Sequence, residues 1–517
     1  MLKKLKQLKI IDWILIIMVI FIPMVLITSI FKNLDNDIWY LLSEGKYILQ
    51  NGLYKTDVLS MHEGLDIIVQ NWLSAVIFWI VYAFLGSYGL FFMVMITNCI
   101  ILYLLYKICM LISDDNKGLS IITTVFTDLS LCLFFIVSRP QIFSFVIILI
   151  LIYLLELYIK YDDTKYLKFI PILSFLEINL HASIWWYIFL FMIPYIIDSF
   201  KNKKLMLQGY RKKPLFITFI ISLLVGFINP YGYKAITFIF NSYGDKYMLN
   251  NILELQPFNL NNLTGILTFV VILITMLMYV YFRKGSIRVR YLCLYCGTLI
   301  IGMKSIKGLN LFMLVASFPI ALLLKDIFPR KFKKHEVLKT RILYVLITLI
   351  TVGVVGYTGY RYTKMNDRIK LNHMGSKAMN TLNMFAGNRV SNVYVSFNDG
   401  GFIEFSGHKP YIDPRAEVFL KKNNHKEDIY KEYCEFEAGQ IDINEFLEKY
   451  NFDFLYLRFG ERLYKEEKID NYFVIYDDIS TGYKVYARND IVTDEVRKMV
   501  IKEYEKSKQN NKKELDE

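Results

Sequence analysis

The sequence predicts a polytopic α-helical membrane protein that carries a small α/β domain toward its C-terminal end. The chain of 517 residues is 55% hydrophobic and 16% aromatic, and its mean hydropathy is +0.35. This composition is typical of proteins with many membrane helices and unusual for water-soluble proteins. Long apolar runs alternate with short basic loops, and the composition becomes mixed and polar after Tyr360.

The basic residues and the cysteines argue against two other classes of protein. The net charge is +13, but Lys and Arg occur in short loops between apolar runs, which indicates membrane orientation and not nucleic-acid binding. The six cysteines give no disulfide framework. Cys293 and Cys296 form a CxxC spacing inside an apolar run without a second ligand pair, so packing is favoured over a metal site.

The basic loops predict the orientation of the chain. The first ten residues carry four lysines and no acid, and residues 11–31 form an apolar run long enough to cross a bilayer. This run is long for a signal peptide and lacks a small-residue cleavage site. Residues 200–213 and 283–290 carry six and four basic residues without an acid, and residues 325–341 carry seven against two acids. We therefore place the N-terminus and these three loops in the cytoplasm.

The predicted path contains about eleven transmembrane helices within residues 1–360, and it leaves the C-terminal region outside. The helix over 11–31 is followed by spans at 89–112, 118–137, 141–159, 167–180, 183–199, 214–231, 264–282, 289–305, 309–327 and 341–360. The first external loop is 32–88.

Residues 67–86 are also apolar enough to span the membrane. A crossing here would disturb the alternation of the basic loops unless 167–199 formed a single broken segment. We therefore expect 67–86 to lie along the outer interface, where Trp72, Trp79 and Tyr82 suit the aromatic belt.

Residues 361–490 predict an external α/β domain that is large enough to hold its own core. Helices are predicted over "KAMNTLNMFA" and "INEFLEKY". Strands are predicted over "VSNVYVSF", "GGFIEFS", "FDFLYLRF" and the hairpin "YFVIYDDISTGYKVYAR", which turns at "DISTG". Residues 491–517 are charged and poor in aromatic residues, and they predict a frayed helix or a disordered tail.

A series of short motifs follows in order along most of the chain. They are Asp35 and Asp37 with Trp39, Gly45–Lys46, Asp57 with Ser60, Trp72–Leu73, "SRPQ" (138–141), "NLHAS" (179–183), "NPYG" (229–232), "GGFIEF" (400–405) and "YIDPRAEVF" (411–419). This series resembles the GT-C superfamily of integral membrane glycosyltransferases, and within it the aminoarabinose and protein mannosyl transferases. The resemblance implies a GT-C-like transmembrane domain that moves a hexose or pentose from a polyprenyl-phosphate-linked donor to a glycan, lipid or protein acceptor. The reaction would take place at the outer face of the cytoplasmic membrane, as part of building the cell envelope.

Such a transfer needs a base that takes a proton from the acceptor while the anomeric carbon is attacked. An aspartate near the interface meets this need, so Asp37 is the expected base and Asp35 its helper. A divalent metal, Mg²⁺ or Mn²⁺, is a further expectation at this pair. The alternative is that either aspartate caps the helix predicted over "IWYLLSEGKYIL".

The leaving phosphate needs cations. Arg139, Lys304 and Lys307 are all expected on the outer side close to membrane depth, and Arg139 can hold a phosphate through two parallel hydrogen bonds. The alternative for Arg139 is an interfacial anchor whose charged end reaches the headgroups.

Four more residues are expected to contact the substrate: Trp39, His181, Glu254 and Arg415. His181 lies between two apolar runs, and a packing role is its alternative. Glu254 belongs to the loop 232–263 and is assigned to the acceptor. Arg415 has a structural ion pair with Asp413 as its alternative.

Other functions stay open from the sequence. A lipid-linked saccharide flippase or other transporter often shows internal repeats, and none is visible between the two halves of the chain. An O-antigen-type polymerase would carry one large central external loop. A non-catalytic membrane scaffold that presents the C-terminal domain is the third alternative.

Overall fold

The computed structural model describes residues 35–202, 207–242, 244–261, 263–281, 288–325 and 373–492. These residues form two compact units. The helical unit comprises residue 35 and the described residues from 70 to 325, and the C-terminal unit comprises 36–69 and 373–492. The predicted spans 11–31 and 341–360, and nearly all of the tail 491–517, lie outside the described residues.

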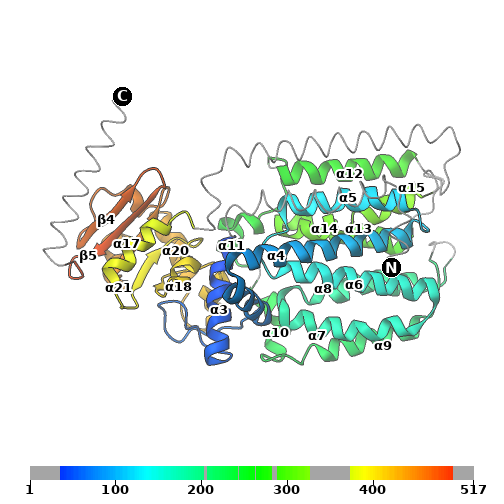
Figure 1. The fold of residues 1–517 in the computed structure, drawn as a ribbon, viewed down its shortest axis with the longest axis horizontal. Helices are drawn as coiled ribbons and strands as arrows, with labels where there is room; N and C mark the ends of the chain where they lie inside the picture. Colours follow the sequence, from blue (N-terminus) through cyan, green and yellow to red (C-terminus); the bar gives the residue numbers. More distant parts are fainter. Residues whose placement is uncertain are drawn as a thin grey trace. The chain divides into compact units, whose positions relative to one another are not determined.

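The helical unit consists of helices that lie side by side (Figure 1). They are α4 (Trp72–Ile112), α5 (Lys117–Phe134), α6 (Gln141–Tyr161), α7 (Ile170–Leu180), α8 (Trp186–Asp198), α9 (Lys212–Val225), α10 (Tyr233–Ser242), α11 (Lys246–Asn251), α12 (Leu263–Tyr281), α13 (Val289–Lys304), α14 (Leu309–Val315) and α15 (Ser317–Leu324). Short 3-10 helices join them: η1 (Thr164–Phe169), η2 (Ala182–Ile184), η3 (Leu253–Leu255) and η4 (Ile306–Gly308). Each predicted span between 89 and 327 coincides with one of these helices or with two in succession.

Three helical segments in the described part of the chain are long and apolar enough to cross a membrane. They are Trp72–Ile112, Gln141–Tyr161 and Ile306–Leu324. Several of the other helices are shorter than the roughly 20 residues that a perpendicular crossing needs. The prediction of about eleven spans is therefore not confirmed, although the order of the apolar helices in the described residues follows it.

Helix α4 breaks at Gly86, whose backbone (φ 60°, ψ −154°) lies outside the helical region. Glycine tolerates this conformation because it has no Cβ atom. The break separates a first arm from the segment that continues to Ile112, close to the predicted boundary between the interfacial segment and the next span. Residues 167–199 are not one continuous helix, because α7 ends at Leu180 and α8 begins at Trp186. The alternative of a single broken segment over 167–199 stays open, and the interfacial position of 67–86 stays a prediction.

The start of α4 is attached to helix ends that were predicted on the outer side. The backbone N–H of Ala182 donates to the carbonyl oxygen of Gln70 at 2.8 Å. The indole Nε1 of Trp72 donates to the side-chain oxygen of Asn179 at 3.2 Å. The first arm of α4 therefore begins beside the end of α7.

The other end of α4 is attached to helix ends that were predicted on the cytoplasmic side. Lys325 pairs with Asp114 at 3.4 Å, and Lys160 pairs with Asp115 at 3.7 Å. The two ends of α4 therefore contact different sets of helix ends. A single crossing by α4 stays a prediction. Which set faces the cytoplasm also stays a prediction.

A buried cluster around Arg290 joins the ends of three helices, α6, α8 and α13. Arg290 Nε and Nη2 donate to the two carboxylate oxygens of Glu156 at 2.9 and 3.0 Å, and Nη1 donates to Asp198 at 2.8 Å and to Gln208 at 2.7 Å. The side chains of Arg290, Glu156 and Asp198 are 6%, 6% and 0% exposed. Because each charge has a bonded partner, the cluster is tolerated inside the helical unit and fixes α6, α8 and α13 together.

The C-terminal unit contains a five-stranded sheet in the order β2-β1-β3-β5-β4 (Figure 1). Its strands are β1 (Asn392–Val395), β2 (Lys409–Pro410), β3 (Phe454–Arg458), β4 (Tyr472–Asp478) and β5 (Tyr483–Arg488). Strand β1 pairs in parallel with β2 and β3, whereas β3, β5 and β4 pair antiparallel. The helical elements are α3 (Asp37–Asn51), α17 (Ser376–Ala386), α18 (Gly400–Phe405), α19 (Lys421–Asn424), α20 (Ile429–Glu437), α21 (Ile443–Tyr450), η6 (Ala416–Phe419) and η7 (Leu463–Lys465).

One predicted strand is wrong. The segment "GGFIEF" forms helix α18 and not a strand. Its two phenylalanines, Phe402 and Phe405, are three residues apart and both contact the ring of Trp39, with centroids at 5.1 and 4.9 Å. A helix places residues with this spacing on one face, whereas a strand would place them on opposite faces. The predicted helices over "KAMNTLNMFA" and "INEFLEKY", and the hairpin turning at "DISTG", are confirmed.

The division of the chain also differs from the predicted one, because residues 36–69 belong to the C-terminal unit. Helix α3 packs against α18, and Gly401 lies so close to α3 that a Cβ atom there would be 2.9 Å from the backbone nitrogen of Tyr40. The unit is therefore discontinuous in sequence, with most of the helical unit inserted between its two parts.

Candidate functional site

Three candidate residues from distant parts of the helical unit form one ion-paired cluster. Arg139 Nε donates to Asp35 Oδ1 at 2.9 Å. Its Nη1 donates to both carboxylate oxygens of Glu254, at 2.7 and 2.8 Å. The side chains of Asp35 and Arg139 are 19% and 18% exposed, and that of Glu254 is 44% exposed. The cluster is therefore open to the surface on the side of Glu254.

Local turns hold these residues in place. Arg139 stands in the short connection between α5 and α6, where its N–H donates to the carbonyl oxygen of Val137 at 2.8 Å. Glu254 lies in η3, which packs against η4. The backbone N–H of Ile306 donates to the carbonyl oxygen of Gln256 at 2.9 Å, so the segment with Lys307 is tied to the segment with Glu254.

The charges of this cluster act on Glu254. Partial burial would raise the pKa of its carboxyl, but Arg139 and Lys307 outweigh burial and hold that pKa below its usual range. Glu254 is therefore ionised at neutral pH. The negative charges of Asp35 and Glu254 offset the positive charge of Arg139, so an incoming phosphate would meet an arginine that already binds two carboxylates.

The other expected phosphate ligands lie near this cluster in sequence and differ in exposure. Lys304, the last residue of α13, is exposed, and Lys307 in η4 is half-buried. Lys307 influences the electrostatics of Glu254 and of His181, which is 8% exposed at the end of α7. The helical unit thus brings together Asp35, Arg139, Glu254 and Lys307 of the predicted residues.

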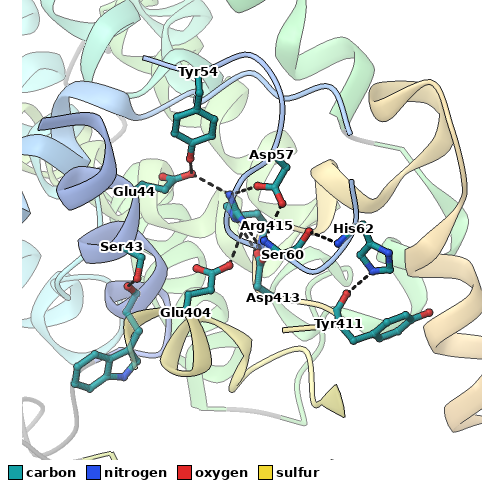
Figure 2. A network of polar contacts seen from close by, with 11 residues as sticks. Ser43, Glu44, Tyr54, Asp57, Ser60, His62, Glu404, Tyr411, Asp413 and Arg415 are labelled. Atoms are coloured by element: carbon teal, nitrogen blue, oxygen red, sulfur yellow. Dashed lines mark hydrogen bonds and ion pairs between the residues drawn. The ribbon is translucent and has the colours of Figure 1, made fainter. Parts of the chain in front are cut away.

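The C-terminal unit holds a second charged cluster, centred on Arg415 (Figure 2). Arg415 binds Asp413 through two parallel hydrogen bonds, Nε to Oδ1 at 2.9 Å and Nη2 to Oδ2 at 2.7 Å. It also contacts Asp57 at 2.9 Å, Glu404 at 3.0 Å and Glu44 at 3.5 Å. Its side chain is 3% exposed, and each of the four acids is at most 1% exposed. Arg415 therefore joins the 36–69 segment to the rest of the C-terminal unit and has little surface to offer a substrate.

Four acids around one arginine cannot all stay charged at this burial. Burial raises the pKa of Glu44 to about 8, against the opposing effect of Arg415. Burial and the neighbouring Asp413 raise the pKa of Glu404 well above its usual range. In Asp57 burial acts in the same sense, but Arg415 and hydrogen bonds from Ser60 prevail and lower its pKa. Glu44 and Glu404 thus hold protons at neutral pH, and each has one buried oxygen without a hydrogen-bond partner in the described part of the chain.

Two predicted residues lie on α3 of the C-terminal unit. Asp37 is in the first turn of the helix, where a negative charge is favourable beside the helix N-terminus. The N-cap position is Asn36, so Asp37 is not itself the cap. Trp39 is 5% exposed and packs against Phe402 and Phe405, which favours a packing role over substrate contact.

The described residues contain no group of three or more His, Cys, Asp or Glu side chains that could hold a metal ion. Asp35 is paired with Arg139. A divalent metal at Asp35 and Asp37 stays a prediction.

Several buried ionisable residues were not predicted from the sequence. Glu44 and Glu404 around Arg415, and Glu156 and Asp198 around Arg290, all lie within or at the end of helices with many apolar residues. Glu177 is a further example, with 0% exposure in α7. The signal was present in each case, since an acid inside an apolar run demands a partner.

Comparison with known proteins adds little. No protein-family model and no curated protein sequence matches this chain. Among solved structures, the chain is similar to an oligosaccharyltransferase from Archaeoglobus fulgidus, crystallised with Zn and sulfate, with a TM-score of 0.48 and 12% sequence identity. The match covers 91% of this chain and 73% of the archaeal chain. A similarity of this size carries no conclusion about fold or activity.

Proposed function

We propose that this chain is a membrane glycosyltransferase that moves a sugar from a polyprenyl-phosphate-linked donor to an acceptor at the outer surface of the membrane. The observation that carries the proposal is the cluster of Asp35, Arg139 and Glu254, together with the nearby Lys307, drawn from four distant parts of the sequence. On the predicted path all four lie on the outer side. A surface cluster with charges of both signs suits a reaction in which a proton is removed and a phosphate leaves.

In the proposed reaction the hydroxyl oxygen of the acceptor attacks the anomeric carbon of the donor sugar. The proton of that hydroxyl passes to a carboxylate, the bond from the anomeric carbon to the phosphate oxygen breaks, and polyprenyl phosphate is released. Asp37 is the proposed base, because an aspartate near the interface can accept the proton of the acceptor. Asp35, which accepts a hydrogen bond from Arg139, is its proposed helper. Lys304 and Lys307 are proposed to stabilise the leaving phosphate, and Arg139 to orient Asp35 and Glu254.

The test uses purified protein in lipid nanodiscs with a panel of synthetic polyprenyl-phosphate-linked hexoses and pentoses. Release of polyprenyl phosphate, followed by mass spectrometry in the presence of a membrane extract as acceptor, is the readout. Asp37→Asn should lower the rate by about a hundredfold or more, the usual scale for general base catalysis. Asp35→Asn should have a smaller effect, because its partner Arg139 keeps Glu254.

Two outcomes would change the proposal. A well-folded Asp37→Asn protein with an unchanged rate would move the base to Asp35 and then to Glu254. If no donor in the panel yields polyprenyl phosphate, glycosyl transfer is refuted, and the transporter and scaffold alternatives take its place.

The proposed sidedness has its own test, which uses single cysteines and a membrane-impermeant thiol reagent in intact cells. Met384, which is 81% exposed in the C-terminal unit, should be labelled when replaced by cysteine. A cysteine at position 286, in a predicted cytoplasmic loop, should be labelled only after the cells are opened. The parent protein with its six native cysteines gives the background. The reverse pattern would place the proposed site on the wrong side of the membrane.

A further inference from the structure

A buried hydrogen-bond chain in the helical unit ends at His181. Ser144 Oγ on α6 lies 2.5 Å from Glu177 Oε1 and 3.1 Å from His181 Nδ1. Ser144 and Glu177 are 0% exposed and His181 is 8% exposed. The second carboxyl oxygen of Glu177 has no hydrogen-bond partner among the described residues.

The backbone around His181 is fixed from several directions. Helix α7 ends at Leu180, and the N–H of His181 still donates to the carbonyl oxygen of Glu177 at 2.8 Å. Ser74 Oγ on α4 donates to the carbonyl oxygen of Leu180 at 2.7 Å. The imidazole is therefore held at the junction of α4, α6 and α7, at the helix ends predicted on the outer side.

The position of each proton in the hydrogen-bond chain from Glu177 through Ser144 to His181 can be assigned. Burial, and secondly the charge of Lys307, lower the pKa of His181 to about 3, so the ring is neutral and carries one N–H. A charged carboxylate at Glu177, with a single hydroxyl partner and no exposed surface, would stay largely uncompensated. The consistent arrangement is that neutral Glu177 donates to Ser144 and Ser144 donates to Nδ1 of His181. The ring proton then resides on Nε2.

The Nε2 atom of His181 has no hydrogen-bond partner in the described ranges, and it is not fully enclosed. The positive charge of Lys307 acts on the imidazole ring of His181. Arg139, by contrast, already binds two carboxylates. A neutral N–H donor beside a lysine is suited to an oxygen that carries negative charge.

We propose that His181 donates its Nε2–H to a phosphate oxygen of the lipid-linked donor beside Lys307, and that Ser144 and Glu177 are positioning residues that keep the proton on Nε2. This inference rests on the proposed function, since it names how the same protein recognises the phosphate. It shifts the main phosphate contact from Arg139 to His181 and Lys307.

The test measures binding of undecaprenyl phosphate to the whole protein in lipid bilayers, together with ¹⁵N solid-state NMR of histidine-labelled protein. The chain has six histidines, and His181→Gln identifies the signal of His181. In the wild type the protonated nitrogen should be Nε2, and its resonance should shift when the lipid phosphate binds. His181→Leu should raise the Kd by about tenfold to a hundredfold, the scale of a hydrogen bond to a charged group. His181→Gln, which keeps an N–H donor, should stay within about fivefold of the wild type.

Glu177 provides the matched pair for the positioning role. Glu177→Gln keeps an N–H donor toward Ser144 and should bind the lipid phosphate as the wild type does, with Nε2 still protonated. Glu177→Leu removes the donor and should weaken binding. Loss of binding in Glu177→Gln, or a proton on Nδ1 in the wild type, would overturn the proposal.

Failure of the inference differs from failure of the proposed function. If undecaprenyl phosphate binds but neither shifts the His181 resonance nor depends on His181, the phosphate contact lies elsewhere and the glycosyltransferase proposal survives. If the wild type does not bind undecaprenyl phosphate, the proposed function is refuted and this inference with it.

Discussion

Replacing Glu44 by glutamine should stabilise the C-terminal unit, and the gain should grow with pH. Glu44 is buried beside Arg415, Asp57 and Glu404, and its pKa rises from 4.5 to about 8 on folding. The folded protein binds this proton more tightly than the unfolded chain does. The contribution of Glu44 to the free energy of unfolding is therefore greatest below pH 4.5. It falls as the pH rises, until Glu44 ionises in both states above about pH 8. Glutamine has the shape of the protonated acid and avoids this loss.

The size of the effect follows from the difference in pKa. Each unit corresponds to about 1.4 kcal/mol, so the gain should be about 1 kcal/mol at pH 5, about 3 kcal/mol at pH 7 and close to 5 kcal/mol above pH 8. At about 2 to 4 °C per kcal/mol for a unit of this size, the melting temperature should rise by about 6 to 12 °C at pH 7.

The assay is thermal unfolding of the detergent-solubilised protein between pH 5 and pH 9, followed by intrinsic fluorescence. Glu63→Gln is the matched control, since Glu63 belongs to the same segment and is exposed; its effect should be small at every pH. If Glu44→Gln gives the same shift at pH 5 and pH 8, or destabilises the protein at pH 8, then Glu44 is charged in the folded protein and the reasoning about the Arg415 cluster is wrong.

Two further predictions concern packing and buried charge, both read from the same unfolding assay. Gly401→Ala should destabilise the protein by about 1 to 3 kcal/mol, because the new Cβ atom would lie 2.9 Å from a backbone atom and 3.2 Å from a side-chain atom of Tyr40. The control Gly297→Ala should be neutral or slightly stabilising, because its Cβ atom would meet nothing within 4 Å. Arg290→Leu should lower the free energy of unfolding by about 3 to 5 kcal/mol, because it leaves two buried carboxylates uncompensated. The control Arg211→Ala breaks an ion pair whose side chains are 51% and 63% exposed, and it should lower the free energy of unfolding by less than about 1 kcal/mol. If the two variants of either pair lost the same amount of stability, the difference in packing or burial between the two sites would not explain the effect.

The sequence predicted the elements whose signal is local. Apolar runs bounded by basic loops gave the order of the helices, and alternating residues around "DISTG" gave the hairpin of β4 and β5. The break of α4 at Gly86 lies close to the predicted end of the interfacial segment, whose position at the membrane stays a prediction. The order of the helices and the hairpin depend on neighbours in the chain, so no knowledge of tertiary contacts was needed.

The partners of the charged residues could not be predicted in the same way. The motif that suggested Arg139 as a phosphate ligand contains no hint that Asp35 and Glu254, 104 and 115 residues away, would bind it. The strand predicted over "GGFIEF" failed because the position of Trp39 decides which side of that segment is buried. Roles that depend on proton position, as at Ser144 and His181, need distances that a sequence does not contain.

The two-part make-up of the C-terminal unit has a consequence for biosynthesis. Asp57 and Arg415 are 358 residues apart. Because ribosomes add about 5 to 20 residues per second, Arg415 is synthesised roughly 20 to 70 seconds after Asp57. During that interval Glu44 and Asp57 are carried by a segment that has neither α18 nor the sheet to fold against. A fragment that starts at residue 373 would conversely contain Arg415 without two of its four acids. The nascent first segment therefore lacks these packing partners until nearly the whole chain has been translated.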